Sequence, residues 1–198
     1  MEKREEILNS ARSLFAKSGF QGTSLSHIAT AANTQKQLIT HHFGTKDNLW
    51  REVVNKEFED GIELLRAVQK TAVEIGAPTA IKQFIHDYIH WCARKRDIHR
   101  IMVFDSQANN PRFQWYMDKH FRPSHKVMTG LIRKAQRQDA ICKGDPGRIY
   151  FTFMNMISSL VLGELTFETY TGRPPNNEDD IENLKSMIFK VLDMPDSQ

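Results

Sequence analysis

The sequence predicts an all-α fold, in which an N-terminal helix-turn-helix domain of three helices precedes a larger helical domain, with about nine helices altogether. Apolar residues recur at the spacing of an amphipathic helix along nearly the whole chain. No stretch shows the sustained alternation of apolar and polar residues that indicates a β-strand. The 198 residues are 40% hydrophobic and 26% charged, which is typical of a globular protein with a substantial core.

The segment 23–50 predicts two short helices joined by a tight turn and followed at once by a third helix. A hydroxyl at Thr23 or Ser24 can cap the first helix, and Asn33 tolerates the left-handed conformation that the turn requires. The second helix opens at Thr34 or Gln35, runs through His41, and is too polar to be buried. The first helix props it with one apolar stripe, formed by Leu25, Ile28, Ala29 and Ala32. A short polar helix on an apolar prop is suited to reading the major groove of DNA.

Positive charge is concentrated in the same part of the chain. Residues 1–56 contain eight Lys and Arg against five Asp and Glu, and the whole chain contains 27 against 24. The remainder of the chain is therefore balanced. A local excess of positive charge favours a polyanionic partner such as double-stranded DNA, although a solvated surface can carry the same excess.

Four sequence blocks, correctly ordered and spaced, make residues 5–52 resemble the N-terminal domain of the tetracycline-repressor-like (TetR) family of transcriptional regulators. They are the apolar side of the first helix (Ile7, Leu8, Ala11, Leu14 and Phe15), S-G-F-Q-G-T-S at 18–24, I-A at 28–29, and H-H-F-G-T-K-D-N-L at 41–49. The chain departs from the family at two positions. Thr40 stands where these proteins often carry a phosphate-binding Tyr, and Asn33 replaces the usual turn Gly.

The resemblance implies a ligand-responsive, DNA-binding transcriptional regulator and not an enzyme. Residues 1–50 would bind DNA, and residues 51–198 would bind the ligand and dimerise. The expected mechanism is that of a repressor, which a small and largely apolar effector releases from a near-palindromic operator. The alternative is a helical enzyme or interaction module with an accidental helix-turn-helix pattern. The sequence contains no familiar motif for a catalytic site or a cofactor.

The predicted DNA contacts divide into base readers and phosphate ligands. Gln37 can bond adenine and Lys36 can reach guanine in the major groove, while Leu38 can touch a thymine methyl. Thr40 faces the same groove, and Ser26 can reach a flanking base. The predicted phosphate ligands are Thr23 or Ser24, His41 and Lys46.

The rest of the chain is predicted to be helical between clear breaks. A long helix spans 47–71, and Pro78 opens a helix that ends near Lys95. Further helices cover 97–107 and about 112–138, with an interruption near Pro123. The last two helices span 146–170 and 179–192.

The large domain is rich in aromatic and Met residues, which predict an effector pocket. Met adapts its shape, so Met-lined walls suit apolar ligands of varied form. Any one of these residues can instead be core filler. Asp105, Glu164 or His90 are the expected polar anchors. The predicted pocket residues are Phe84, Tyr88, Trp91, Met102, Asp105, Phe121, Met128, Phe151, Met154 and Glu164.

The segment 149–167 is apolar nearly all round, so more than one of its sides must be covered. It can be buried within one domain, or it can pack against a second copy of the chain. The resemblance favours the second interpretation, because TetR-like proteins usually pair their last two helices in a four-helix bundle. The predicted interface of the homodimer contains Leu160, Val161, Gly163, Phe167, Leu184 and Ile188.

Three further features concern metals, export and membranes. His86 and His90 have the spacing of metal ligands but lie opposite the apolar stripe of their helix, so no metal site is expected. The charged N-terminus lacks an apolar stretch, which predicts a cytoplasmic protein without a secretory signal. The polar residues Asn155 and Glu164 make a membrane-spanning role for 149–167 costly, so no membrane partner is expected.

Overall fold

The computed structural model describes residues 2–106, 110–175 and 177–194, and within these ranges it contains helices and turns but no β-strand. The predicted all-α fold is confirmed. The chain forms two compact units, one of residues 1–59 with 95–119 and one of residues 60–94 with 120–198. This structural division differs from the predicted domains 1–50 and 51–198, because two later helices pack with the N-terminal ones. The assignment of functions to domains stays a prediction.

The first unit is organised around its N-terminal helix. Helix α1 packs against α4, α7 and α2, while α3 packs against α2 and α4. Its core contains Phe15, Leu49 and Trp50, none of which is exposed. The helices of this unit are α1 (Glu2–Gly22), α2 (Leu25–Ala31), α3 (Lys36–Phe43), α4 (Lys46–Glu57), α7 (Arg96–Ser106) and α8 (Pro111–Tyr116).

Helix α1 is kinked at Gly19, which has φ of 66° and is buried. A Cβ built at this position would lie 3.2 Å from the ring of Phe104, so both the backbone and the available space favour glycine. The kink places the last turn of α1, including Phe20, against the start of α4. This junction supports the helix-turn-helix pair.

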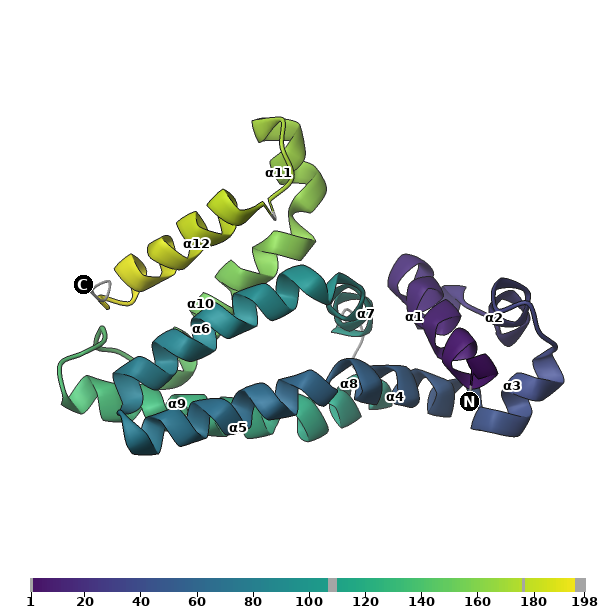
Figure 1. Ribbon diagram of the computed structural model, residues 1–198, viewed down its shortest axis with the longest axis horizontal. Helices are drawn as coiled ribbons and strands as arrows, with labels where there is room; N and C mark the ends of the chain where they lie inside the picture. The colour runs from purple at the N-terminus through teal and green to yellow at the C-terminus, as the bar shows by residue number, and fades with distance from the viewer. Residues whose placement is uncertain (1, 107–109, 176, 195–198) are drawn as a thin grey trace. The chain divides into compact units, whose positions relative to one another are not determined.

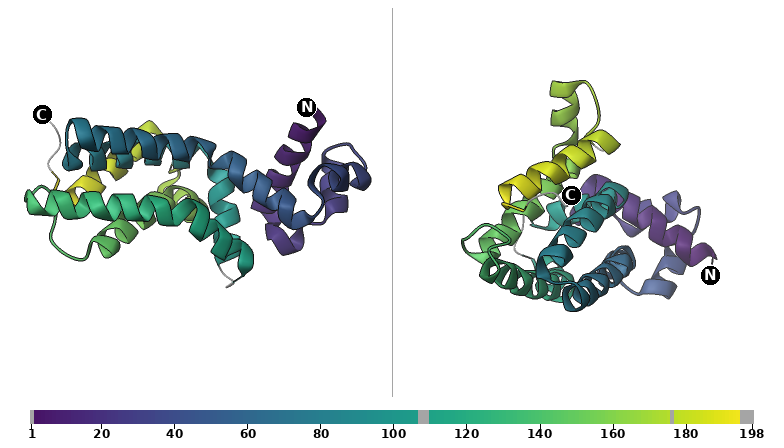
Figure 2. Two further views of the ribbon diagram at one scale, coloured as in Figure 1. Left: turned by 90° about the horizontal axis from the view of Figure 1, so that it is seen from below. Right: turned by 60° about the vertical axis from the view of Figure 1, so that its left-hand side comes forward.

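The second unit has a core of three helices, α6, α9 and α10, which pack on one another (Figure 1 and Figure 2). Helix α12 covers α6 and α10. The helices of this unit are α5 (Glu59–Glu74), α6 (Ala77–Arg94), the π-helix η1 (Met117–Phe121), α9 (Arg122–Arg137), α10 (Pro146–Leu162), α11 (Glu164–Thr171) and α12 (Glu178–Val191). Along the chain, α5 begins at the last residue of the first unit, and η1 includes residues of both units.

Two of the long predicted helices are each divided in two. The predicted helix 47–71 is broken at Phe58, whose φ of −94° and ψ of 1° end α4. The predicted helix 146–170 bends by 71° between α10 and α11. Gly163 forms that junction, and a Cβ there would lie 3.3 Å from the carbonyl oxygen of Ser159. The interruption expected near Pro123 is present as the π-helical turn η1, because proline cannot donate the regular helical hydrogen bond.

No single helix among the described residues has both the length and the apolar composition needed to cross a membrane. The bent pair α10 and α11 passes that test of length and composition only when the two helices are taken together.

Candidate nucleic-acid interface

The turn between α2 and α3 is built from local hydrogen bonds. The Ser24 hydroxyl accepts from the backbone N–H of His27 at 3.1 Å and caps α2. Asn33 adopts the predicted left-handed conformation, with φ of 46°. The backbone N–H of Thr34 then donates to the carbonyl of Ala29 at 2.9 Å and closes the turn. These contacts orient α3 relative to α2.

The apolar prop under α3 is buried as predicted. Ile28 and Ala29 of α2 pack below, and Ile39 and Phe43 of α3 point inward. Leu38 is half-buried. The opposite face of α3 exposes the four predicted polar residues, Lys36, Gln37, Thr40 and His41.

These exposed side chains differ in how far they are already engaged. The Thr40 hydroxyl donates to the Lys36 carbonyl at 3.1 Å, which leaves its oxygen lone pairs as acceptors. Ser26 on α2 is exposed as well. The structure therefore presents the predicted base readers together at the surface.

Thr23 does not fit its predicted role as a phosphate ligand. Its side chain is buried, and the residue is only 2% exposed. The hydroxyl donates toward the carbonyls of Gly19 at 2.8 Å and Leu14 at 3.2 Å. Thr23 therefore ties the kinked end of α1 to α2, whereas Ser24 and His41 remain exposed.

Lys46 also points inward. Its ammonium donates to the carbonyls of Phe20 and Thr23, at 2.9 Å each, and lies 4.0 Å from the centre of the Phe20 ring. Burial and the nearby charge of Arg112 lower the pKa of Lys46. The geometry thus makes Lys46 a cap for carbonyls at the end of α1, in place of the phosphate ligand that the sequence predicted.

The start of α4 is capped by a side chain. The Thr45 hydroxyl caps this helix by accepting from the backbone N–H of Asn48 at 3.1 Å. The N–H groups of the first turn carry the positive end of the helix dipole. Next to this turn, a polar groove of about 270 Å³ is lined by side chains that include His42, Asn48 and Arg51. The sequence signal for this groove was limited to the polar spacing along α4.

Arg112 connects the start of α4 to α7, a link that the sequence did not predict. Its guanidinium lies 3.6 Å from the centre of the Phe20 ring. It donates to Asp105 at 3.1 and 3.3 Å and to Asp47 at 3.4 Å. The charge of Asp105, which the sequence assigned to an effector anchor, is therefore matched inside the first unit.

The predicted effector residues fall into both units, with Met102 and Asp105 in the first and the others in the second. In the second unit, aromatic rings form a chain of contacts. Phe84 stacks on Tyr88 with ring centres 5.4 Å apart, and Tyr88 stacks on Trp91 at the same separation. Phe84 also contacts Phe153 at 6.3 Å. The sequence alone did not favour Phe153, because aromatic residues also stand at 150 and 151 of α10.

The other predicted pocket residues differ in exposure. Met128 is fully buried and Met154 is 9% exposed. Phe121 contacts Tyr150, with ring centres 5.8 Å apart; burial raises the pKa of Tyr150 to about 12. Phe151 is 56% exposed, so it lies outside the aromatic cluster, contrary to the prediction. Glu164 and His90 are both half-buried. An effector pocket stays a prediction.

The predicted interface residues differ in exposure, and the interface itself stays a prediction. Val161 and Ile188 are buried inside the second unit, at 4% and 0% exposure. Leu160, also predicted, lines a groove although it is itself 3% exposed. On α10 and α12 the exposed apolar residues directly follow or precede buried ones, because successive helical positions point in different directions. Exposed large apolar residues on α10, α11 and α12 are Phe151, Leu162, Leu165, Tyr170, Met187 and Val191.

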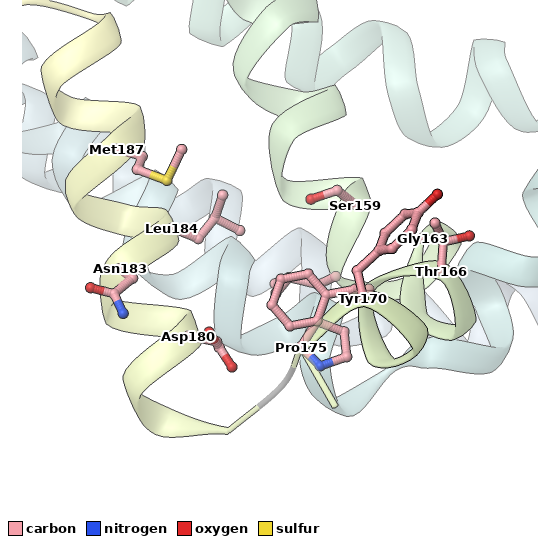
Figure 3. A pocket seen from close by; sticks show the side chains of 11 residues that line it. Ser159, Gly163, Thr166, Tyr170, Pro175, Asp180, Asn183, Leu184 and Met187 are labelled. Atoms are coloured by element: carbon pink, nitrogen blue, oxygen red, sulfur yellow. The ribbon is translucent and has the colours of Figure 1, made fainter. Parts of the chain in front are cut away.

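A groove of about 410 Å³ lies between α12 and the bent pair α10 and α11. Figure 3 shows Leu184 and Met187 of α12 across from Ser159 and Tyr170. The predicted interface residues Leu160, Gly163, Phe167 and Leu184 line it. The apolar face that the sequence predicted is therefore present, with a different set of outward residues.

Residues 7–53 match a family model described as bacterial regulatory proteins, tetR family. Over 166 residues the chain is 26% identical to the HTH-type transcriptional repressor AcnR of Corynebacterium jeikeium, and the match covers 75% of this chain and 82% of the relative.

Two solved structures have the same fold. The TetR family transcriptional regulator PfmR of Thermus thermophilus superimposes with a TM-score of 0.70 at 17% identity, covering 96% of this chain and 99% of PfmR. AibR, solved in complex with isovaleryl coenzyme A and operator DNA, superimposes with a TM-score of 0.75 at 20% identity, covering 96% of this chain and 98% of AibR. At these identities the likeness establishes the fold alone.

Proposed function

We propose that this member of the tetR family of bacterial regulatory proteins is a repressor, which a small effector releases from its operator. The family consists of DNA-binding transcriptional regulators and not of enzymes. The observation that carries the DNA-binding part is the exposed polar face of α3 on a buried apolar prop. Lys36 and Gln37 supply the donors and acceptors that read base edges in the major groove. Phosphate contacts come from Ser24, His41 and the N–H groups at the start of α4.

The test of base reading is a comparison of cognate and random DNA. An operator is first selected from genomic fragments with the full chain, and binding is then followed by fluorescence anisotropy over a salt series. Gln37→Ala should weaken cognate binding by about 1–3 kcal/mol and change random binding little. Gln69→Ala, an exposed glutamine on α5, is the matched control. Equal weakening of cognate and random DNA by Gln37→Ala would exclude base reading by this side chain.

The proposed repressor is a two-fold homodimer that meets its partner through α10, α11 and α12. Tyr170 is 84% exposed and Met187 57%, and both line the groove between α12 and the bent pair; Leu165, on α11, is 78% exposed. Covering such a patch with the same surface of a second copy removes apolar area from water. An isologous dimer presents two identical readers, so the operator is a near-palindrome.

The dimer is tested by sedimentation of full-length variants. Leu165→Glu and Met187→Glu should produce monomers and remove specific operator binding. Val73→Glu is the control, because Val73 is 88% exposed but lies on α5. If the wild type is already monomeric at micromolar concentration, or if both interface variants remain dimers, this interface is wrong.

For the effector we propose a small, largely apolar molecule that binds at the aromatic cluster of the second unit. The supporting observation is the chain of contacts from Trp91 through Tyr88 to Phe84, together with Met128 and Met154. AibR was solved with isovaleryl coenzyme A, so acyl thioesters belong in the screen next to free apolar compounds.

The effector is tested by thermal shift followed by DNA competition. A compound that binds the second unit should weaken operator affinity, and operator should weaken compound binding by the same factor. Tyr88→Ala should reduce the affinity for the compound without changing the affinity for DNA. A compound that binds tightly and leaves operator affinity unchanged would contradict release by an effector.

A further inference from the structure

The structure brings three metal-ligating side chains together on the second unit. They are His86 and His90 of α6 and Glu182 of α12, and their ligand atoms all lie within 4.8 Å of one another. The two histidines are four residues apart, so both project from the same face of α6. Their ring centres are 4.6 Å apart. The sequence showed only the two histidines, and the third ligand comes from a helix more than ninety positions later.

Helix α12 packs on α6 (Figure 1), and this packing brings Glu182 to the two histidines. The ammonium of Lys82 lies 5.7 Å from the centre of the Phe189 ring. Lys82 is one helical turn before His86, whereas Phe189 is two turns after Glu182. The two helices therefore run antiparallel, and this second contact holds Glu182 next to the histidine pair.

We propose that His86, His90 and Glu182 bind a divalent transition-metal ion of the Zn²⁺ type. Two imidazoles and one carboxylate form a ligand set that suits Zn²⁺ and its neighbours, whereas Mg²⁺ and Ca²⁺ prefer oxygen ligands alone. With bonds of about 2.0 Å, tetrahedral ligand atoms are about 3.3 Å apart, so the side chains must close around the ion. His86 and Glu182 are exposed and His90 is half-buried, which leaves their rotamers free to adjust.

The site is open to solvent on the side of α5. A groove of about 330 Å³ is lined by His86 and His90 together with Asp60, Asp87 and Arg94. An ion can reach the ring nitrogens through this groove, and water can complete the coordination as the fourth ligand. The two carboxylates favour a cation there, and Arg94 opposes it.

Lys185 competes with a metal ion for Glu182. Its ammonium forms an ion pair with that carboxylate from one turn further along α12. Binding of the ion must therefore displace Lys185. This competition predicts opposite effects for two neighbouring substitutions, because removing the ligand weakens binding whereas removing its competitor strengthens it.

The experiment uses the full chain after treatment with a chelator and dialysis. Zn²⁺ affinity is measured by competition with a chromophoric chelator, and Co²⁺ binding is followed by its visible absorption. We expect saturable binding of one ion per chain, and a rise in melting temperature with Zn²⁺ but not with Mg²⁺, because the ion binds the folded state.

His86→Ala, His90→Ala and Glu182→Gln should each weaken Zn²⁺ binding by more than about tenfold. Substituting a residue that merely hydrogen-bonds a metal ligand already lowers metal affinity by about that factor. Lys185→Gln should strengthen it. The matched controls are His27→Ala and Asp179→Asn, two exposed residues outside the cluster, and they should leave the affinity unchanged. The proposal is overturned if the wild type binds no Zn²⁺ saturably, if the three ligand variants retain wild-type affinity, or if Lys185→Gln weakens binding.

Discussion

Replacing Arg112 by Met should lower the free energy of unfolding by about 3–5 kcal/mol, because it leaves a buried carboxylate without its partner. The side chain of Asp105 is 5% exposed and that of Arg112 is 12% exposed. Asp105 accepts two bonds from the guanidinium, at 3.1 and 3.3 Å, and one from the Asn110 amide at 3.3 Å. After the substitution only the amide remains to compensate the charge. Methionine fills a similar volume, so the loss arises mainly from charge.

The assay is urea unfolding of the full chain, with the free energy taken by linear extrapolation. The control is Arg66→Met, which breaks the ion pair between Arg66 and Glu63. Because these side chains are 68% and 70% exposed, the substitution should lower the free energy of unfolding by less than about 1 kcal/mol. Adding Asp105→Asn to Arg112→Met should recover part of the loss, because the uncompensated charge is then absent. The reasoning is wrong if Arg112→Met costs no more than the surface control, or if the double variant is less stable than the single one.

Three further predictions concern the first unit. Burial lowers the pKa of His99 to about 4. The unfolded chain, in which the pKa is about 6.5, therefore binds more protons than the folded chain between these two pH values. Stability that is present above about pH 6.5 is lost as the pH falls toward 4. Urea unfolding at pH 7.5 and pH 5 should show the wild type losing about 2 kcal/mol more than His99→Gln, and equal losses would refute a lowered pKa for this half-buried histidine. Thr23→Val should cost about 1–2 kcal/mol in the same assay because two carbonyls lose their donor, whereas Thr30→Val, which alters an exposed hydroxyl, should cost less. Lys46→Met should lower stability by about 1–2 kcal/mol and leave the salt dependence of DNA binding unchanged, whereas a slope flatter by about one unit would restore its predicted role as a phosphate ligand.

The helix-turn-helix pair was predictable because its determinants are local. The apolar stripe of α2, the capping hydroxyl of Ser24 and the left-handed Asn33 all act within a few residues of their own positions. The exposure of Gln37 follows from the same periodicity, since it lies opposite the buried Ile39. Local rules also predicted α6, with its apolar stripe, and the interruption near Pro123.

The positions where helices break required the tertiary structure. Nothing in the local pattern separates Phe58 from its helical neighbours, yet α4 ends there. Gly163 is tolerated within many helices, and its bend of 71° depends on how α10 and α11 pack. That bend then decides which residues of the apolar segment face outward.

The sequence by itself determined the fold class, the reading helix and the apolar character of the last helices, because each depends on periodicity along the chain. It could not determine where individual polar side chains point, because their partners are distant in sequence. Thr23 and Lys46 turn toward α1, Asp105 is matched by Arg112, and Glu182 meets the histidines of α6. A period shows that a face is apolar or polar, but only the packing of one helix on another shows which residue that face meets.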